Sequence, residues 1–79
     1  MKFNYNRLKA ERVAKGYTVE DMGQFIGVTK GSYSKKENGK AVLTVEEFSI
    51  IIKELKFPKD DIGIFFTFDV SDSETKTTA

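Results

Sequence analysis

The feature that most constrains the fold of this chain is the stretch over residues 18–40, whose pattern indicates two short helices around a tight turn. Thr18 precedes a run with apolar residues near helical spacing, and Asp21 follows three positions later, as in a capping box. Gly27 is placed to end this helix, because glycine adopts the left-handed backbone that closes helices. Thr29 can then cap a second helix. Two helices joined by a turn of about four residues containing glycine form a helix-turn-helix.

The second of these helices, expected over residues 30–37, offers polar side chains for an outward face. Lys30 and Lys35 could reach the acceptor atoms of guanine in the major groove of DNA, although each could equally contact only phosphate. Ser32 suits either base, and the methyl group of Thr29 suits thymine.

Composition excludes most catalytic and metal-binding classes. The chain of 79 residues is long enough for one domain with a small core. It has no cysteine and no histidine, so it lacks disulfides, thiolates and the commonest general base and metal ligand. Ser32, Tyr33 and Ser34 have no base beside them in the sequence, which nucleophilic catalysis requires. We therefore expect no enzymatic activity, no catalytic residues, no cofactor and no metal.

The predicted location is the cytoplasm. No apolar run approaches the roughly 20 residues that span a membrane. The first six residues also lack the apolar stretch of a signal peptide.

Charge is distributed unevenly along the chain, although the net charge is only +1. Residues 1–40 hold nine Lys or Arg against four Asp or Glu, a net charge of +5, and residues 41–79 hold four Lys against eight acids, a net charge of −4. The first part could face phosphates while the second is repelled by them. The alternative is an ordinary scatter of solvated charges.

Three further helices are expected. The first runs from about residue 6 to 15, with Asn4 or Asn6 as its cap. Another runs over residues 44–55, because Thr44 and Glu47 form a capping box. Its apolar stripe is expected in the core and consists of Val45, Phe48, Ile51, Ile52 and Leu55.

A fifth helix is expected over residues 59–65, opened by Pro58. Asp60 and Asp61 stand in its first turn, where carboxylates complement the helix dipole, and a metal-binding role is not expected for them.

The end of the chain leaves two alternatives open. Apolar residues alternate from Ile62 to Val70, which favours a strand, but the same residues could complete the fifth helix to Phe66 before a short strand or arm. A lone strand has an unpaired edge, so we expect it to pair with its copy in a homodimer. The predicted dimerisation residues are Ile64, Phe66 and Phe68. Residues 71–79 are expected to be disordered or a linker, which gives a domain over 1–66 and a strand or tail over 67–79.

The segment from Leu8 to Leu55 resembles the Xre/Cro-type helix-turn-helix family, which includes phage repressors and Cro proteins. The resemblance implies an all-α, five-helix, lambda-repressor-like DNA-binding domain. The residues that carry it are Leu8, Lys9, Arg12, Lys15, Gly16, Thr18, Met22, Ile26, Gly27, Val28, Thr29, Ser34, Glu37, Asn38, Gly39, Lys40 and Leu55.

The resemblance also implies roles for individual residues. Arg12 is expected to pair with Glu37, and Asn38 and Lys40 to bind phosphate. Lys36, often apolar in the family, is expected to extend toward the phosphates. The chain also departs from the family at Val19, which stands in place of glutamine, at Gly23, in place of alanine, and at Gly31, in place of a base-reading side chain.

The function implied by the resemblance is a sequence-specific transcriptional regulator of the phage repressor or Cro type, in a bacterial or phage-infected host cell. It would bind double-stranded DNA as a homodimer on a palindromic operator, with the third helix in the major groove. The alternative is a protein-binding helix-turn-helix module, such as an antirepressor or antitoxin. The expected DNA-binding residues are Thr18, Thr29, Lys30, Gly31, Ser32, Ser34, Lys35, Asn38 and Lys40.

Overall fold

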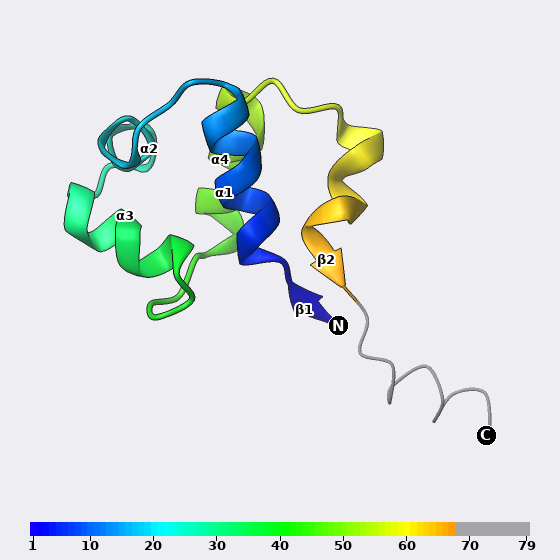
Figure 1. Ribbon diagram of the computed structural model, residues 1–79, viewed down its shortest axis with the longest axis horizontal. Helices are drawn as coiled ribbons and strands as arrows, with labels where there is room; N and C mark the ends of the chain where they lie inside the picture. The colour runs from blue at the N-terminus through cyan, green and yellow to red at the C-terminus, as the bar shows by residue number, and fades with distance from the viewer. Residues whose placement is uncertain (68–79) are drawn as a thin grey trace.

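The computed structural model describes residues 1–67, which form five helices and one short antiparallel ribbon (Figure 1). The predicted all-α class with five helices is confirmed. In chain order the elements are β1 (Lys2–Phe3), α1 (Tyr5–Ala14), α2 (Val19–Ile26), α3 (Lys30–Glu37), α4 (Val45–Glu54), η1 (Lys59–Phe65) and β2 (Phe66–Thr67). Helices α2 and α3 lie on one side of α1, and η1 and β2 lie on the other (Figure 1).

Local capping residues set the helix boundaries that the sequence predicted. The Thr18 Oγ1 accepts from the Asp21 amide at 3.0 Å, while the Thr18 amide donates to the Asp21 carboxylate at 2.8 Å. Thr44 and Glu47 form the same reciprocal box at the start of α4, with distances of 2.9 and 3.0 Å. Asn4, one of the two predicted alternatives, caps α1. Each such cap is worth about 1 kcal/mol, so these short helices are well delimited.

The core takes at least one fully buried side chain from every helix. Burial of each such side chain contributes about 1.5–3 kcal/mol, and shared packing holds helices that are too short to be stable alone. These residues are Leu8, Met22, Tyr33, Ile51, Leu55 and Phe65. The prediction was wrong for Val45, which is 80% exposed, because it is the first residue of α4 and extends beyond the elements that cover the rest of the stripe.

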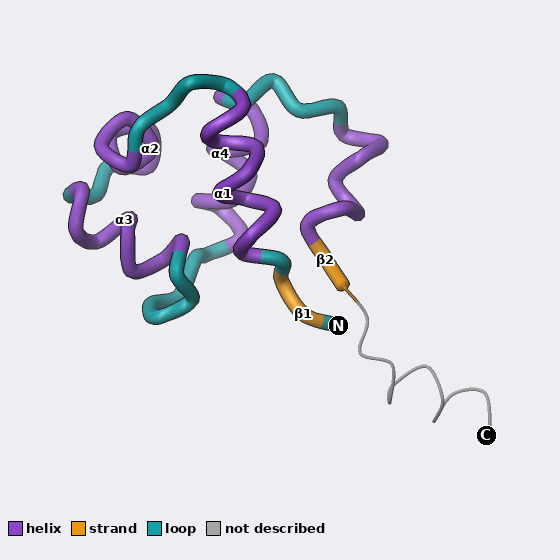
Figure 2. Tube along the Cα trace, viewed as in Figure 1, coloured by secondary structure: helices purple, strands orange, loops and turns teal. Residues whose placement is uncertain are grey.

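The end of the described chain differs from the expectation in two ways. The fifth helix has 3₁₀ rather than α geometry, and within the described residues the strand that follows is Phe66–Thr67. This strand pairs within its own chain, with Lys2 opposite Thr67 and Phe3 opposite Phe66 (Figure 2). The premise of a lone strand was therefore wrong, because β1 supplies a partner. Phe68, the alternation to Val70 and the predicted tail over 71–79 lie outside the described residues.

Candidate nucleic-acid interface

A buried ion pair fixes the orientation of α3. Arg12 donates from Nε and one terminal nitrogen to the two carboxylate oxygens of Glu37, at 2.9 and 3.0 Å. Its other terminal nitrogen donates to the Tyr17 carbonyl at 2.9 Å. Arg12 is 8% exposed and Glu37 is 6% exposed. The hydrogen bond to Glu37 raises the pKa of Arg12 against the opposing effect of burial. The pair that the resemblance implied thus joins α1 to α3.

Tyr33 lies on the same inner side of α3. Its side chain is fully buried, and its hydroxyl has no hydrogen-bond partner within residues 1–67. Burial first, and then the negative charge of Glu37, raise the pKa of Tyr33, so the phenol stays neutral. The inner side of α3 therefore packs against the rest of the protein.

The turn between α2 and α3 lies directly against α2 at Gly23. A methyl group at this position would be 2.9 Å from the Val28 carbonyl oxygen and 3.2 Å from the Thr29 carbonyl oxygen. Even alanine would therefore require the turn to shift, which gives a physical reason for glycine here. Gly27 ends α2 in the left-handed region, with φ of 76°. Together these glycines allow the close approach of the two helices.

The outer side of α3 gathers most of the predicted DNA-binding residues. Lys30, Gly31 and Lys35 are exposed along the helix, while Ser32 and Ser34 are half-buried. A methyl group at Gly31 would meet no atom within 4 Å. The exposed predicted residues on or next to this helix are Thr29, Lys30, Gly31, Lys35, Asn38 and Lys40.

Some predicted contacts are already engaged in internal hydrogen bonds. The Thr29 Oγ1 accepts from the Ser32 amide at 3.1 Å, as the cap of α3, which leaves its methyl group for a base. The Asn38 side-chain amide donates to the Ser34 hydroxyl at 3.5 Å, a long bond that a phosphate could replace.

The start of α2 is a poor place for phosphate. Thr18 caps this helix, and its backbone amide already donates to Asp21. Glu20 and Asp21 both lie in the first turn. Their negative charge opposes the attraction that a helix N-terminus has for anions. Thr18 therefore stands apart from the predicted residues on α3.

Lys36 does not extend toward the outer side of α3, so this expectation was wrong. Its Nζ donates to the Val42 carbonyl at 2.6 Å and to the Glu47 carboxylate at 3.1 Å. A hydrogen bond to a carboxylate is stronger than one to a neutral acceptor, and the half-buried stem of Lys36 brings its ammonium to Glu47. Sequence reasoning missed this link, since eleven residues separate Lys36 from Glu47 and no local pattern relates them.

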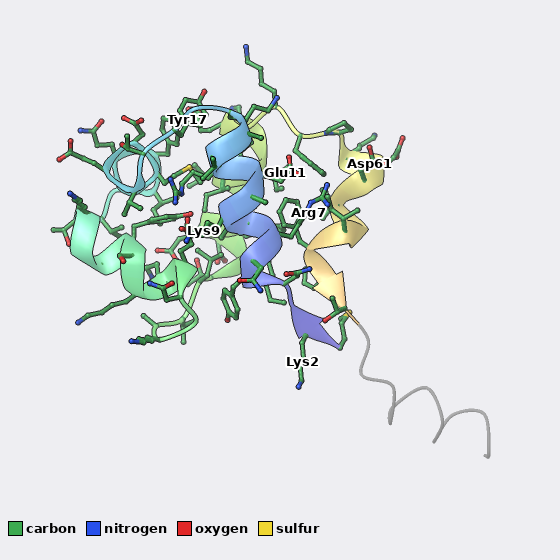
Figure 3. All side chains as sticks on the ribbon, viewed as in Figure 1. Lys2, Arg7, Lys9, Glu11, Tyr17 and Asp61 are labelled. Atoms are coloured by element: carbon green, nitrogen blue, oxygen red, sulfur yellow. The ribbon has the colours of Figure 1, made fainter. Side chains whose placement is uncertain are left out.

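The cations on the outer side of α3 differ from those in the packed regions. Lys30, Lys35 and Lys40 form no ion pair within residues 1–67, and the only acid in residues 29–41, Glu37, is buried against Arg12. By contrast, Arg7 pairs with Glu11 at 2.8 Å on the side of α1 that faces η1 (Figure 3). The outer side of α3 therefore presents positive charge without internal neutralisation.

Two other kinds of site were sought in the described part of the chain. No group of three or more Asp or Glu side chains is placed there to hold a metal ion. None of its helices is long and apolar enough to cross a lipid bilayer.

Comparison with known proteins agrees with this arrangement. Residues 8–62 match a protein family described as helix-turn-helix. Searches of curated proteins and of solved structures found no match.

Proposed function

Since the chain belongs to the Xre/Cro-type helix-turn-helix family of DNA-binding transcriptional regulators, we propose that it is a sequence-specific repressor of the phage repressor or Cro kind. In this proposal α3 lies in the major groove of a palindromic operator. Two copies bind half-sites about one helical turn apart. Regulation follows from occupancy, because a bound dimer blocks polymerase or a competing repressor.

The observation that supports the proposal best is the uncompensated charge on α3. Lys30, Lys35 and Lys40 are exposed, and no carboxylate neutralises them within residues 1–67. Cations of this kind gain affinity from DNA by releasing counterions from the duplex. The buried pair of Arg12 and Glu37 then keeps the helix orientation fixed while its outer side meets the groove.

We assign base contacts and phosphate contacts to residues according to their positions on α3 or just after it. In this proposal Lys30, Gly31 and Lys35 approach base edges, and Ser32 and Ser34 contribute shorter contacts. Asn38 and Lys40, just after α3, bind the phosphate backbone and set the register.

A selection from random duplexes at about 100 mM salt tests the proposal, followed by a salt titration on the enriched sequence. A palindromic consensus is expected. If Lys30, Lys35 and Lys40 of both copies all neutralise phosphates, the slope of log affinity against log salt should be about −5, and if only Lys40 does so, about −2. A folded protein that enriches no sequence and shows no salt-dependent binding would contradict the proposal.

A second candidate function is a protein-binding helix-turn-helix module of the antirepressor or antitoxin kind. The start of α2 favours it, because Glu20 and Asp21 place negative charge at a helix N-terminus, where phosphate would otherwise be attracted. Failure of the DNA selection, together with capture of a repressor or toxin that does not depend on salt, would support this alternative.

A further inference from the structure

The helix α3 ends in a turn whose backbone hydrogen bonds form a Schellman motif. The Gly39 amide donates to the Lys36 carbonyl at 3.2 Å, and the Lys40 amide donates to the Lys35 carbonyl at 2.8 Å. Gly39 adopts the left-handed backbone that this motif requires, with φ of 75°. Asn38 and Lys40 flank Gly39, so the directions of both side chains depend on the backbone of this glycine.

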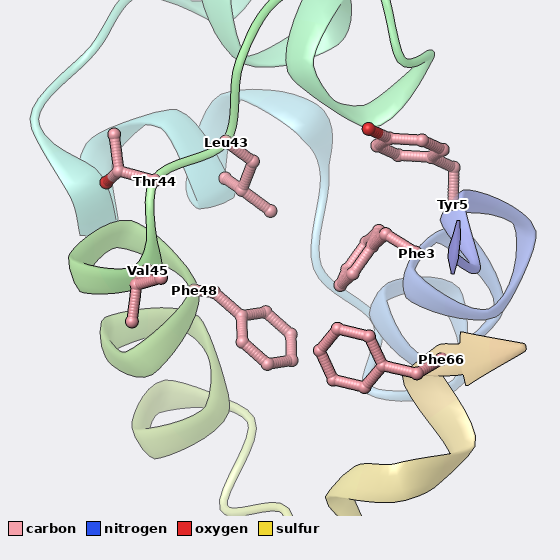
Figure 4. A pocket seen from close by; sticks show the side chains of 7 residues that line it. All are labelled: Phe3, Tyr5, Leu43, Thr44, Val45, Phe48 and Phe66. Atoms are coloured by element: carbon pink, nitrogen blue, oxygen red, sulfur yellow. The ribbon is translucent and has the colours of Figure 1, made fainter. Parts of the chain in front are cut away.

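The aromatic ring of Tyr5, the first residue of α1, lies against the backbone of Gly39. The three nearest atoms that a methyl group at Gly39 would meet, at 3.2, 3.4 and 3.5 Å, are all ring carbons of Tyr5. Figure 4 shows Tyr5 between Phe3 and the end of α3. The close ring and the left-handed backbone both favour glycine at this position. The Tyr5 ring therefore limits how far the turn can move toward α1.

The ring of Tyr5 is itself connected to the hydrophobic core. Its centroid lies 5.0 Å from that of Phe3, in an edge-to-face arrangement. Phe3 in turn stacks on Phe65, which is fully buried, with their centroids 6.2 Å apart. Aromatic pairs in such arrangements are favourable beyond the area that they bury. A row of three rings thus connects the core to the turn at Gly39.

The side chains of the turn have few other contacts to hold them. Asn38 and Lys40 are both exposed. The Asn38 amide donates a long hydrogen bond of 3.5 Å to Ser34, and Lys40 forms no ion pair within residues 1–67. Ordering an exposed side chain on binding costs free energy, and this cost is smaller when its backbone is already fixed. The affinity of the turn for phosphate therefore depends on how firmly Gly39 is held.

A polar hollow of about 410 Å³ lies beside this turn, at the start of α1. Tyr5, Asn6 and Asn38 line it, and no Asp or Glu is among the described residues of its lining. The start of α2 differs, because Glu20 and Asp21 occupy its first turn. A phosphate bound by Asn38 would thus meet no carboxylate on the side of the turn that faces α1.

We propose that Tyr5 is a positioning residue for phosphate binding, because its ring holds Gly39, and with it Asn38 and Lys40, in the orientation that meets the DNA backbone. The inference deepens the proposed function and rests on it for the identity of the ligand. It adds the start of α1 to an interface that was predicted only over residues 18–40. Phosphate contacts carry no sequence information, so Tyr5 affects the affinity for every duplex equally.

The first test compares Tyr5→Leu with Tyr17→Leu in the full chain, using fluorescence anisotropy with the operator and a random duplex. Tyr17 is a matched control, since it is also half-buried and its ring meets Phe25 edge to face at 5.1 Å. Thermal unfolding verifies that both variants fold. Tyr5→Leu should weaken binding to both duplexes by the same factor, about three- to tenfold, whereas Tyr17→Leu should bind as the wild type does.

The salt dependence and a conservative variant separate positioning from a direct contact. If Lys40 loses its phosphate in Tyr5→Leu, the salt slope should become shallower by about 1 per copy. Tyr5→Phe retains the ring and should bind as the wild type does. An equal loss in Tyr5→Phe would overturn positioning by the ring and make the hydroxyl itself the phosphate donor. Unchanged binding by Tyr5→Leu, or a loss confined to the operator, would overturn the proposal as well.

Hydrogen exchange without DNA tests the support of the turn independently of the proposed function. The reporter is the Lys40 amide, and the Leu55 amide, bonded to the Ile51 carbonyl in α4, is the internal reference. Relative to this reference, Tyr5→Leu should lower the protection of the Lys40 amide about tenfold, while Tyr5→Phe and Tyr17→Leu should leave it unchanged.

The two ways of failing are distinguishable. Equal protection of the Lys40 amide in the wild type and Tyr5→Leu would overturn the inference, whether or not the protein binds DNA. A wild type that binds no duplex, together with lost protection in Tyr5→Leu, would contradict the proposed function and leave Tyr5 as a structural support of the turn only.

Discussion

The two sides of α3 differ in whether their charged side chains are buried and ion-paired or exposed and unpaired. On the inner side, Glu37 is 6% exposed and its carboxylate is fully matched by Arg12, with Tyr33 buried beside it. On the outer side, Lys30 and Lys35 are exposed and unpaired within residues 1–67. Within the eight residues of α3, the charge of Glu37 is paired inside the protein, whereas the charges of Lys30 and Lys35 form no ion pair within residues 1–67.

The inner residues of α3 anchor the helix to the rest of the protein, whereas its outer residues are the ones that we propose bind DNA. A buried pair is costly to break, because the remaining charge is left without a partner in a place that water does not reach. An exposed, unpaired lysine contributes little to stability, so Lys30 and Lys35 can be replaced without unfolding the protein and are available for the proposed binding. Substitutions on the two sides should therefore affect different measurements.

The largest effect is expected for Glu37→Ala. This substitution leaves the guanidinium of Arg12 buried without its carboxylate, which should lower the free energy of unfolding by about 3–5 kcal/mol. Urea unfolding measures the change. Glu11→Ala is the matched control, because Glu11 pairs with an Arg7 side chain that is 45% exposed, and it should cost less than about 1 kcal/mol. Equal losses of unfolding free energy for the two variants would contradict the distinction between the buried pair of Arg12 and Glu37 and the more exposed pair of Arg7 and Glu11.

The next largest effect is expected for Lys30→Ala and Lys35→Ala, and it concerns binding. Each should weaken operator binding by about 1–3 kcal/mol if the side chain reads a base, with unfolding changed by less than about 0.5 kcal/mol. Fluorescence anisotropy with the operator and a random duplex measures both components. Lys53→Ala, an exposed lysine on α4, is the control and should bind as the wild type does.

Equal weakening on the operator and the random duplex would assign that lysine to phosphate only. An unchanged affinity for both duplexes would exclude the outer side of α3 as the DNA-binding surface.

A smaller effect is expected for Lys36→Met, at the border between the two sides. Methionine retains an apolar stem but loses the hydrogen bonds to Val42 and Glu47, so stability should fall by about 0.5–1.5 kcal/mol. A double-mutant cycle with Glu47→Gln isolates the contact between the two side chains. If Lys36 bound phosphate instead, the substitution would lower DNA affinity while stability stayed unchanged.

The smallest effect is a pH dependence of stability at Glu47. The hydrogen bond from the Thr44 amide, opposed by burial and reinforced by Lys36, lowers the pKa of Glu47 below its ordinary value of 4.5. A lowered pKa in the folded state stabilises the fold above that ordinary value, and this stabilisation is lost as the pH falls through the folded-state pKa.

Glu47→Gln retains an acceptor for the Thr44 amide but does not titrate. The stability difference between the wild type and this variant should therefore shrink at acidic pH, as measured by urea unfolding at a series of pH values. A difference that is constant with pH would show that Glu47 acts only as a neutral acceptor.

Local sequence patterns predicted the elements whose causes are local. Thr18 with Asp21 and Thr44 with Glu47 lie within one helical turn of each other, so their spacing alone identifies two helix starts. Gly27 is equally local, because its left-handed backbone ends α2 where it stands. The pair of Arg12 and Glu37, 25 residues apart, came from resemblance to a family and not from any pattern.

The features that sequence reasoning missed depend on contacts between distant segments. β1 has only two residues, too few to show the alternation of a strand, and it exists because β2 lies beside it. The exposure of Val45 could not be foreseen either, since its periodicity matches the core stripe and only the end of the packed region excludes it. The Lys36 ammonium binds Val42 and Glu47 across the loop before α4, whereas its charge alone indicated a position on the outer side of α3.

The ribbon of β1 and β2 also determines the order in which this domain can be completed. Asn4, the cap of α1, donates its amide to the Phe65 carbonyl at 2.6 Å, and Lys2 lies opposite Thr67. During synthesis Lys2 and Asn4 leave the ribosome near the start of the described residues, and Phe65 and Thr67 leave it near their end. The helical unit of α1 to α4 can form from nearer contacts, whereas the N-terminal segment waits for nearly the whole domain. Pulsed hydrogen exchange should therefore find the Asn4 amide protected later than amides inside α2.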